Sequence, residues 1–181
     1  MRFQRAVISG PVALVALALL TGCGSDDKTK AADPGLPSAA GMASVESFVT
    51  QHASCQHPRT GPAYDANHEG ENDSWGVEEA ADPSWGIKER SVCTDESGHP
   101  VTLLTVPDMK KFQTAAKKNG EQFLVGRNFS VVPVGDATGQ ELTKSGLRFL
   151  TCDPGFTPPS GSRKEPGLVD GCVLSDHFPT D

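Results

Sequence analysis

The sequence predicts an α+β domain: a small antiparallel sheet of two hairpins, with helices on one face and two disulfides. Three observations lead to this prediction. A chain of 181 residues has the length of one domain. Between residues 85 and 150 the apolar pattern runs strand, strand, helix, strand, strand, helix, an order typical of α+β folds. Four cysteines lie beyond residue 43: Cys55, Cys93, Cys152 and Cys172.

The first expected element is a short amphipathic helix from Ser44 to about Cys55. Ser44 is a residue type that caps helix N-termini, and apolar residues follow it at helical spacing. Residues 56–83 are rich in proline and glycine and predict a long loop with one helical turn over 77–81. Loops of this length often carry function, so this loop is the first place to look for a site.

Two strands follow the loop. Apolar and β-branched residues predict strands over 85–93 and 101–106, joined by a turn at Asp95-Glu96-Ser97-Gly98. Asp108 then has the position of a helix N-cap, and Asn119-Gly120 has the composition of a helix end. This part of the chain is therefore expected to form a hairpin followed by a helix.

A second hairpin is expected from strands over 122–126 and 129–134. Pro133 predicts that the last of these strands lies at a sheet edge, because proline has no N–H for a ladder. The segment 139–150 fits either a helix or a strand that ends at Cys152. Residues 153–181 are rich in proline, glycine and charge, and no regular element is predicted there.

The N-terminus has the parts of an export signal. Arg2 and Arg5 precede an apolar run over 6–20, which is shorter than the roughly 20 residues of a membrane span. The run ends in Leu20-Thr21-Gly22-Cys23, which resembles the lipobox of bacterial lipoproteins. The resemblance implies cleavage before Cys23, diacylation of its thiol, and a lipid anchor on the extracytoplasmic side of the cell membrane.

Three parts of the chain follow from this signal. Residues 1–22 are expected to be the signal peptide, and 23–42 the lipidated cysteine with a flexible tether. The tether prediction rests on the near absence of large apolar residues over 24–42. Residues 43–181 form the domain. The predicted partner is the membrane, reached through the lipid on Cys23, and no cofactor is predicted.

The five cysteines fit this division. Lipid on Cys23 leaves four thiols, which in an exported domain predict two disulfides in one of three connectivities. We predict Cys55–Cys93 and Cys152–Cys172, because each pair lies on one side of the hydrophobic middle of the chain. Zinc is disfavoured, since no two of the cysteines have the short spacing of structural zinc ligands.

The charge of the chain is acidic. Removing residues 1–22 takes Arg2 and Arg5 from 16 basic residues, which leaves 14 against 23 acidic residues and a net charge of −9. Nucleic acids bind basic surfaces, and electrostatic docking on anionic lipid needs polybasic segments. Both classes of partner are therefore disfavoured, and a protein or envelope partner is left unidentified.

The sharpest local motif is an acidic run that resembles a calcium-binding loop. Oxygen donors stand at alternate positions and a glycine at the sixth: Asp65, Asn67, Glu69, Glu71 and Asp73, with Gly70. The twelfth position, where calcium loops have a bidentate glutamate, is Gly76. A solvated acidic loop is therefore favoured over a calcium site.

Other candidate chemistry is sparse. Trp75 and Trp85 stand in repeated Ser-Trp-Gly settings, where they form either a recognition surface or, more often, a cover for the core. The five histidines are scattered, without a metalloprotease motif. Ser175-Asp176-His177 holds the residue types of a catalytic triad, but triad partners come from separate elements. No nucleophile elbow or phosphate-binding loop is present.

Three runs in the middle of the chain, 89–94, 99–104 and 123–129, are similar to small secreted lipoproteins of actinobacteria that have no assigned activity. The resemblance implies an origin and a fold class but no catalytic residue. We therefore predict a non-enzymatic interaction or accessory module of the cell envelope. The alternatives are a small hydrolase or metal-dependent enzyme that uses the 56–83 loop with a histidine, and a passive envelope constituent.

Overall fold

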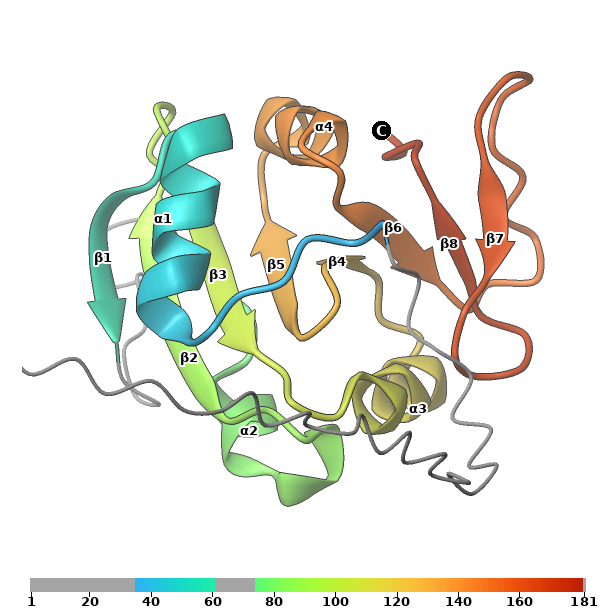
Figure 1. The fold of residues 1–181 in the computed structure, drawn as a ribbon, viewed down its shortest axis with the longest axis horizontal. Coiled ribbons are helices and arrows are strands. Elements are labelled where there is room, and N and C mark those ends of the chain that lie inside the picture. Colours follow the sequence, from blue (N-terminus) through green and yellow to red (C-terminus); the bar gives the residue numbers. More distant parts are fainter. Residues whose placement is uncertain (1–34, 61–73, 181) are drawn as a thin grey trace, which may run out of the picture.

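Figure 1 shows the chain as a computed structural model, which describes residues 35–60 and 74–180. The described residues form one antiparallel sheet of eight strands, in the order β1-β2-β3-β5-β4-β6-β8-β7. The α+β class is therefore confirmed, but the sheet is larger than two hairpins. Its strands are β1 (Gln56–Thr60), β2 (Glu89–Thr94), β3 (Pro100–Thr105), β4 (Phe123–Val125), β5 (Phe129–Pro133), β6 (Arg148–Thr151), β7 (Lys164–Pro166) and β8 (Val173–Ser175).

The helices are α1 (Met42–His52), α2 (Val77–Ala81), α3 (Met109–Asn119) and α4 (Asp136–Lys144), with a 3-10 turn, η2, at Pro83–Trp85. The capping predicted for α3 is confirmed: the Asp108 carboxylate accepts the Lys111 N–H, and Gly120 ends the helix with φ 73°. Helix α1 instead begins after Gly41, which has no side-chain cap. Trp85 belongs to η2, so the strand predicted from residue 85 begins only at Glu89.

Both predicted hairpins are present. β2 pairs with β3 around a turn in which Asp95 accepts the N–H groups of Ser97 and His99. β5, however, lies inside the sheet between β3 and β4, so the edge predicted from Pro133 is wrong. The β4–β5 register ends at Leu124↔Val131. Pro133 therefore lies past the end of this ladder, where its missing N–H costs no strand hydrogen bond.

The sheet is extended by strands that the sequence did not predict. The segment 139–150, left open between helix and strand, contains both, since α4 ends at Lys144 and β6 begins at Arg148. The tail adds β8 beside β6, and β7 outside it. β1 lies in the predicted loop and pairs with β2. β7 and β8 have only three residues each, and every residue of β1 is exposed, so none of the three shows a clear apolar alternation.

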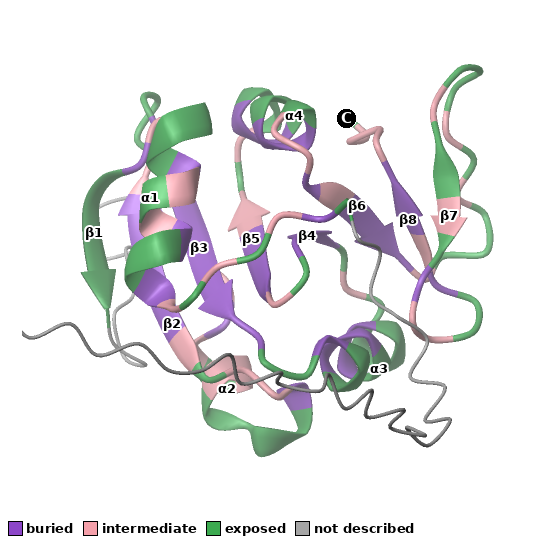
Figure 2. Cartoon of the chain, in the orientation of Figure 1, coloured by how far each residue is buried: buried purple, intermediate pink, exposed green. Residues whose placement is uncertain are grey.

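Helices cover both faces of the sheet, so the prediction of helices on one face is wrong. Alternate β3 residues point to opposite faces: Leu103 packs in a cluster with α1 and α4, and Leu104 packs with α3 and Trp85. All six residues of β3 are buried (Figure 2). A sheet residue needs cover on its own side, so a strand buried throughout requires a layer on each face.

The ordered domain begins before residue 43. Leu36 is buried in the α3-side cluster. The Pro37 carbonyl accepts the Arg127 N–H at 2.7 Å, and the Asn128 side-chain amide makes two hydrogen bonds with the backbone of Ala39. Residues 35–41 are therefore docked on the turn of the β4–β5 hairpin. The tether predicted to run to Met42 can extend at most to residue 34.

Candidate functional site

The candidate residues from the sequence divide into two groups. Cys23 and the acidic run lie outside the described residues; the run comprises Asp65, Asn67, Glu69, Glu71 and Asp73. Within residues 35–60 and 74–180, no group of three or more His, Cys, Asp or Glu side chains is placed to hold a metal ion. The two tryptophans and the four cysteines of the domain are described.

The tryptophans belong to the core. Trp85 is buried, and Trp75 is half-buried against it with ring centroids 5.2 Å apart. Both rings also contact Phe123 edge-on, and Trp85 contacts Phe112. Edge-to-face packing of this kind adds stability beyond the area that it buries. The structure thus places these two residues as a cover over the α3-side core and does not present them as a recognition surface.

Arg90 holds Trp75 in that position. Its side chain is 3% exposed, and it donates to the Ser74 carbonyl, the Ser74 hydroxyl and the Trp75 carbonyl at 2.9–3.2 Å. A buried guanidinium is stable only where its donors are matched in this way. Sequence reasoning missed this role. The one available signal was an arginine inside a predicted strand, two residues before Val92.

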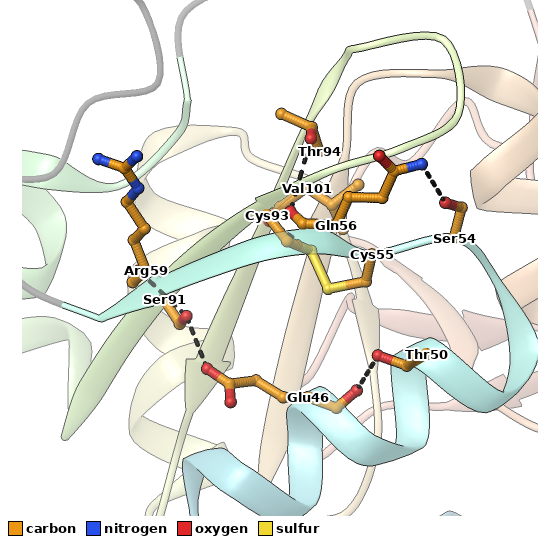
Figure 3. Close-up of a disulfide and its surroundings, with 10 residues drawn as sticks. All are labelled: Glu46, Thr50, Ser54, Cys55, Gln56, Arg59, Ser91, Cys93, Thr94 and Val101. Carbon is orange, nitrogen blue, oxygen red and sulfur yellow. Dashed lines mark hydrogen bonds between the residues drawn. A yellow bond between two sulfur atoms is a disulfide. The ribbon is translucent and has the colours of Figure 1, made fainter.

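Both predicted disulfides are formed, Cys55–Cys93 with Cα atoms 5.2 Å apart and Cys152–Cys172 with Cα atoms 3.9 Å apart. Figure 3 shows the first, which joins the start of β1 to β2 above helix α1. Beside it, the Ser91 hydroxyl donates to the Glu46 carboxylate at 2.9 Å and to the Arg59 carbonyl at 3.1 Å. These contacts tie the exposed edge strand β1 to the sheet and to α1.

The described histidines come from separate parts of the fold. His52 lies at the end of α1 with its ring 4.8 Å from that of Phe48, and His57 is exposed on β1. His99 Nδ1 lies 3.5 Å from Asp95 Oδ2. Among the described residues, this is the one contact between a histidine and a carboxylate. The Asp95 carboxylate already accepts two turn N–H groups and the Thr138 hydroxyl. It acts as the organiser of the β2–β3 turn and its junction with α4.

A small hollow opens where β4 and β5 separate. We call it the β4–β5 hollow; it has a volume of about 240 Å³. Its apolar wall comes from both strands, from β6 and from the C-terminal segment: Phe123, Leu124, Val132, Pro133, Phe149, Phe178 and Pro179. The polar side chains in its lining are those of Gln122 and Asp136. Phe123, Leu124 and Phe149 are themselves buried. The surface of the hollow is therefore mixed, with half-buried apolar residues beside the exposed Gln122 and Asp136.

The local sequence explains this shape. The β4–β5 ladder ends at Leu124↔Val131, and Pro133 has no N–H with which to continue it. Phe178 forms part of the wall because α4 has a glycine beneath it. A Cβ atom on Gly139 would lie 2.5 Å from the Phe178 ring, too close for any real contact. Phe178 also packs on Phe149, with ring centroids 5.6 Å apart.

Two further hollows are more open. One, of about 450 Å³, lies between α2 and the start of β2 and is bounded by Thr60 and Arg90. The other, of about 460 Å³, lies at the end of α1 and is lined in part by His52, Glu96 and Glu141. Arg90 is used to hold residues 74–75, and the three titratable groups at α1 are not placed to share a metal ion.

Comparisons with known proteins identify no relative: no family model, curated protein or solved structure matches the chain. Among the helices of the described ranges, none has the length and apolar composition that a membrane crossing requires.

Proposed function

We propose that this chain is a bacterial lipoprotein, held on the extracytoplasmic face of the cell membrane by lipid on Cys23, whose domain serves as a non-enzymatic binding module. The observation that carries this proposal is the use of the cysteines. The chain has five, and four of them form the two disulfides of the domain. The fifth is Cys23, at the end of the lipobox-like sequence.

The two disulfides support export independently of the lipobox. Structural disulfides persist in oxidising compartments and are rare in the bacterial cytoplasm. Cys93 and Cys172 are each nearly inaccessible to solvent, and each bridge ties an outer strand or its loop to the sheet. A domain stabilised by two such disulfides is suited to an oxidising compartment outside the cytoplasm.

The docked segment 35–41 supports a short anchor. If residues 24–34 behave as a flexible chain, their r.m.s. length is roughly 18 Å. The domain would then stay close to the membrane surface. Because its charge is acidic, repulsion from anionic lipid headgroups would favour a domain held near the membrane without lying flat on it.

The proposed binding role rests on how the fold uses its buried polar groups. Arg90 holds residues 74–75, Asp95 organises a turn, and Gln113 accepts the Leu168 N–H at 2.7 Å. Each of these buried side chains has a structural partner, whereas the β4–β5 hollow is open to solvent and has a mixed polar and apolar lining. Binding at the surface, with no reacting group, is the role that this arrangement supports best.

Membrane fractionation of cells that express the full chain tests the anchor. We expect the wild-type protein in the membrane fraction and the Cys23→Ser variant in the medium or soluble fraction, since two acyl chains give stable anchoring. Ser38→Ala, an exposed change within the docked segment, is the matched control and should remain with the membrane. Equal membrane retention of Cys23→Ser and wild type would refute the lipid anchor.

A further inference from the structure

We propose that the solvent-facing side of helix α3 docks on the anionic phospholipid headgroups of the membrane that holds the chain. This inference rests on the lipid anchor proposed above and adds the orientation of the domain on the membrane. It is carried by the charge of α3, by the point at which the chain enters the domain, and by the short length of chain before that point.

The exposed side of α3 has only basic charge. The buried residues of the helix, Phe112 and Ala116 among them, pack in the cluster that contains Trp85. Four of its six exposed positions are lysines and none is acidic: Lys110, Lys111, Thr114, Lys117, Lys118 and Asn119 (Figure 2). We call the four lysines the α3 lysine stripe. Clusters of about four to eight basic residues on a helix are typical of binding to anionic lipid.

The other described helices have no such side. Helices α1 and α2 contain glutamate but no lysine or arginine, and α4 has Asp136 and Glu141 beside Lys144. The net charge of −7 already favours solubility, so solubility does not require a purely basic helix surface. An anionic partner therefore explains the α3 lysine stripe better than solvation does.

The ammonium groups of the stripe are accessible to such a partner. Within residues 35–60 and 74–180, none of the four lysines forms an ion pair with a carboxylate. Lys117 Nζ donates to the Asp170 carbonyl at 2.7 Å, which uses one of its three donors. Carboxylates border the stripe at Asp82, Asp108, Glu121 and Asp170. Contact with anionic lipid is therefore limited to the helix and does not extend over the acidic remainder of the domain.

The chain enters the domain on the side of the sheet that α3 covers. Leu36 packs in the same cluster as Met109, the first residue of α3. The Val106 N–H donates to the Asn128 carbonyl at 2.9 Å, and the Asn128 side chain holds Ala39. The start of α3 is thus joined to the β4–β5 turn on which residues 35–41 dock.

Two arginines add positive charge near this entry point. Arg127 is exposed, and its backbone N–H donates to the Pro37 carbonyl. Arg148 is half-buried on β6 opposite Val125, and cross-strand partners share a face, so its side chain lies on the α3 side of the sheet. Basic charge therefore lies on both α3 and the strands beside the residues that lead to Cys23.

The short tether keeps the α3 lysine stripe within reach of the membrane. Residues 24–34 have an r.m.s. length of roughly 18 Å as a flexible chain, which is close to the length of α3, about 16 Å for 11 residues. Tethering at this distance gives a high effective concentration of headgroups, so a weak attraction is sufficient for docking. Docking through α3 turns the opposite face, which α1 and α4 cover, away from the membrane.

The test uses the mature chain, from Cys23 to Asp181, produced without lipid and coupled through the Cys23 thiol to a maleimide lipid in vesicles. The other four cysteines are in disulfides and do not react. One set of vesicles is phosphatidylcholine alone, and the other is equal parts of phosphatidylcholine and the anionic phosphatidylglycerol. Acetylation by acetic anhydride, a neutral reagent, is followed at each lysine by mass spectrometry.

We expect Lys110 and Lys118 to be acetylated about five-fold more slowly on the anionic vesicles, relative to Lys144 on α4. One lysine near an anionic surface shifts the docking equilibrium by about this factor. Lys144 is exposed on the opposite face and is the internal reference. High salt should remove the difference, because it screens exposed charges.

Two variants locate the contact. The double variant Lys110→Gln, Lys118→Gln should abolish most of the protection of Lys111, which remains as the reporter. Lys144→Glu lowers the net charge by the same amount on the opposite face, so it is the matched control and should leave Lys111 protected. All three changed positions are exposed, and melting temperatures equal to that of the wild type would show that the fold is kept.

Equal acetylation of Lys110 and Lys118 on the two kinds of vesicle would overturn the proposal, and so would equal loss of protection in the two variants. Slower acetylation of Lys144 than of the stripe would show that the opposite face meets the membrane. The same protection by polyphosphate in solution would assign the stripe to a soluble polyanion. Because the anchor in this test is synthetic, failure of this inference and failure of the Cys23 fractionation experiment are distinguishable.

Discussion

A single residue, Arg90, holds the segment that leads into helix α2. It lies on β2, on the face that carries α3, and its guanidinium reaches the backbone just before α2. The Thr102 hydroxyl donates to the same Trp75 carbonyl at 3.1 Å. Arg90 and Thr102 thus form a polar clamp on the backbone of Trp75, whose ring packs on Trp85 and Phe123.

Replacing Arg90 by methionine should destabilise the domain by about 2–3 kcal/mol, because the buried Ser74 carbonyl and hydroxyl lose their donor. The Trp75 carbonyl keeps Thr102 and loses less. Urea unfolding followed by tryptophan fluorescence measures both the midpoint and the exposure of the two tryptophans. Lys110→Met, an exposed site on α3, is the control. An unchanged midpoint in Arg90→Met would show that the clamp contributes nothing to stability.

Elements of the fold differ in how well they can be predicted from the local sequence. The α3 helix has an aspartate cap, an apolar stripe and a glycine end, and each of these signals acts within a few residues. β7 and β8 have no such local signal, since pairing with β6 and the Cys152–Cys172 bridge define them. The β4–β5 hollow is harder still to foresee, because its wall comes from strands, a helix and the C-terminal segment.

At the same scale, the docked segment 35–41 should contribute to stability although its composition suggests a tether. Leu36→Ala is expected to cost about 2–5 kcal/mol, the usual range for a buried leucine. Asn128→Ala, which removes two hydrogen bonds to Ala39, should cost about 1–2 kcal/mol. Thermal unfolding compares both variants with Ser38→Ala. Melting temperatures equal to that of the control would show that residues 35–41 do not stabilise the domain and belong to the tether.

The two disulfides stabilise different elements and should differ in strength. Chain-entropy arguments give about 4 kcal/mol for Cys55–Cys93, whose cysteines have a sequence separation of 38, and about 3 kcal/mol for Cys152–Cys172, with a separation of 20. Paired Cys→Ser variants, unfolded in urea, measure the two contributions. We expect the loss of Cys55–Cys93 to expose β1 to proteolysis, and the loss of Cys152–Cys172 to expose β7 and β8. If loss of Cys55–Cys93 exposed β7 and β8, and loss of Cys152–Cys172 exposed β1, the assignment of each bridge to its element would be wrong.

At the scale of the whole molecule, the proposal is that lipid on Cys23 anchors a disulfide-bonded α+β domain that serves as a binding module. The sequence predicted the α+β class, both disulfides and the two central hairpins, because these depend on patterns along the chain. It did not predict cover on both faces of the sheet, although the unbroken burial of β3 has a trace in the apolar pair Leu103-Leu104. The proposed binding surface, by contrast, exists only in the folded chain.

The most direct test of the central claim is the mass of the mature protein, isolated from a membrane fraction and digested to release its N-terminal peptide. We expect a peptide that begins at Cys23 and has the added mass of a diacylglyceryl group, with or without a further acyl chain on its amine. Treating the cells with an inhibitor of the lipoprotein signal peptidase should leave residues 1–22 attached. A mature peptide that begins elsewhere, or an unmodified thiol on Cys23, would show that Cys23 is not a lipid anchor.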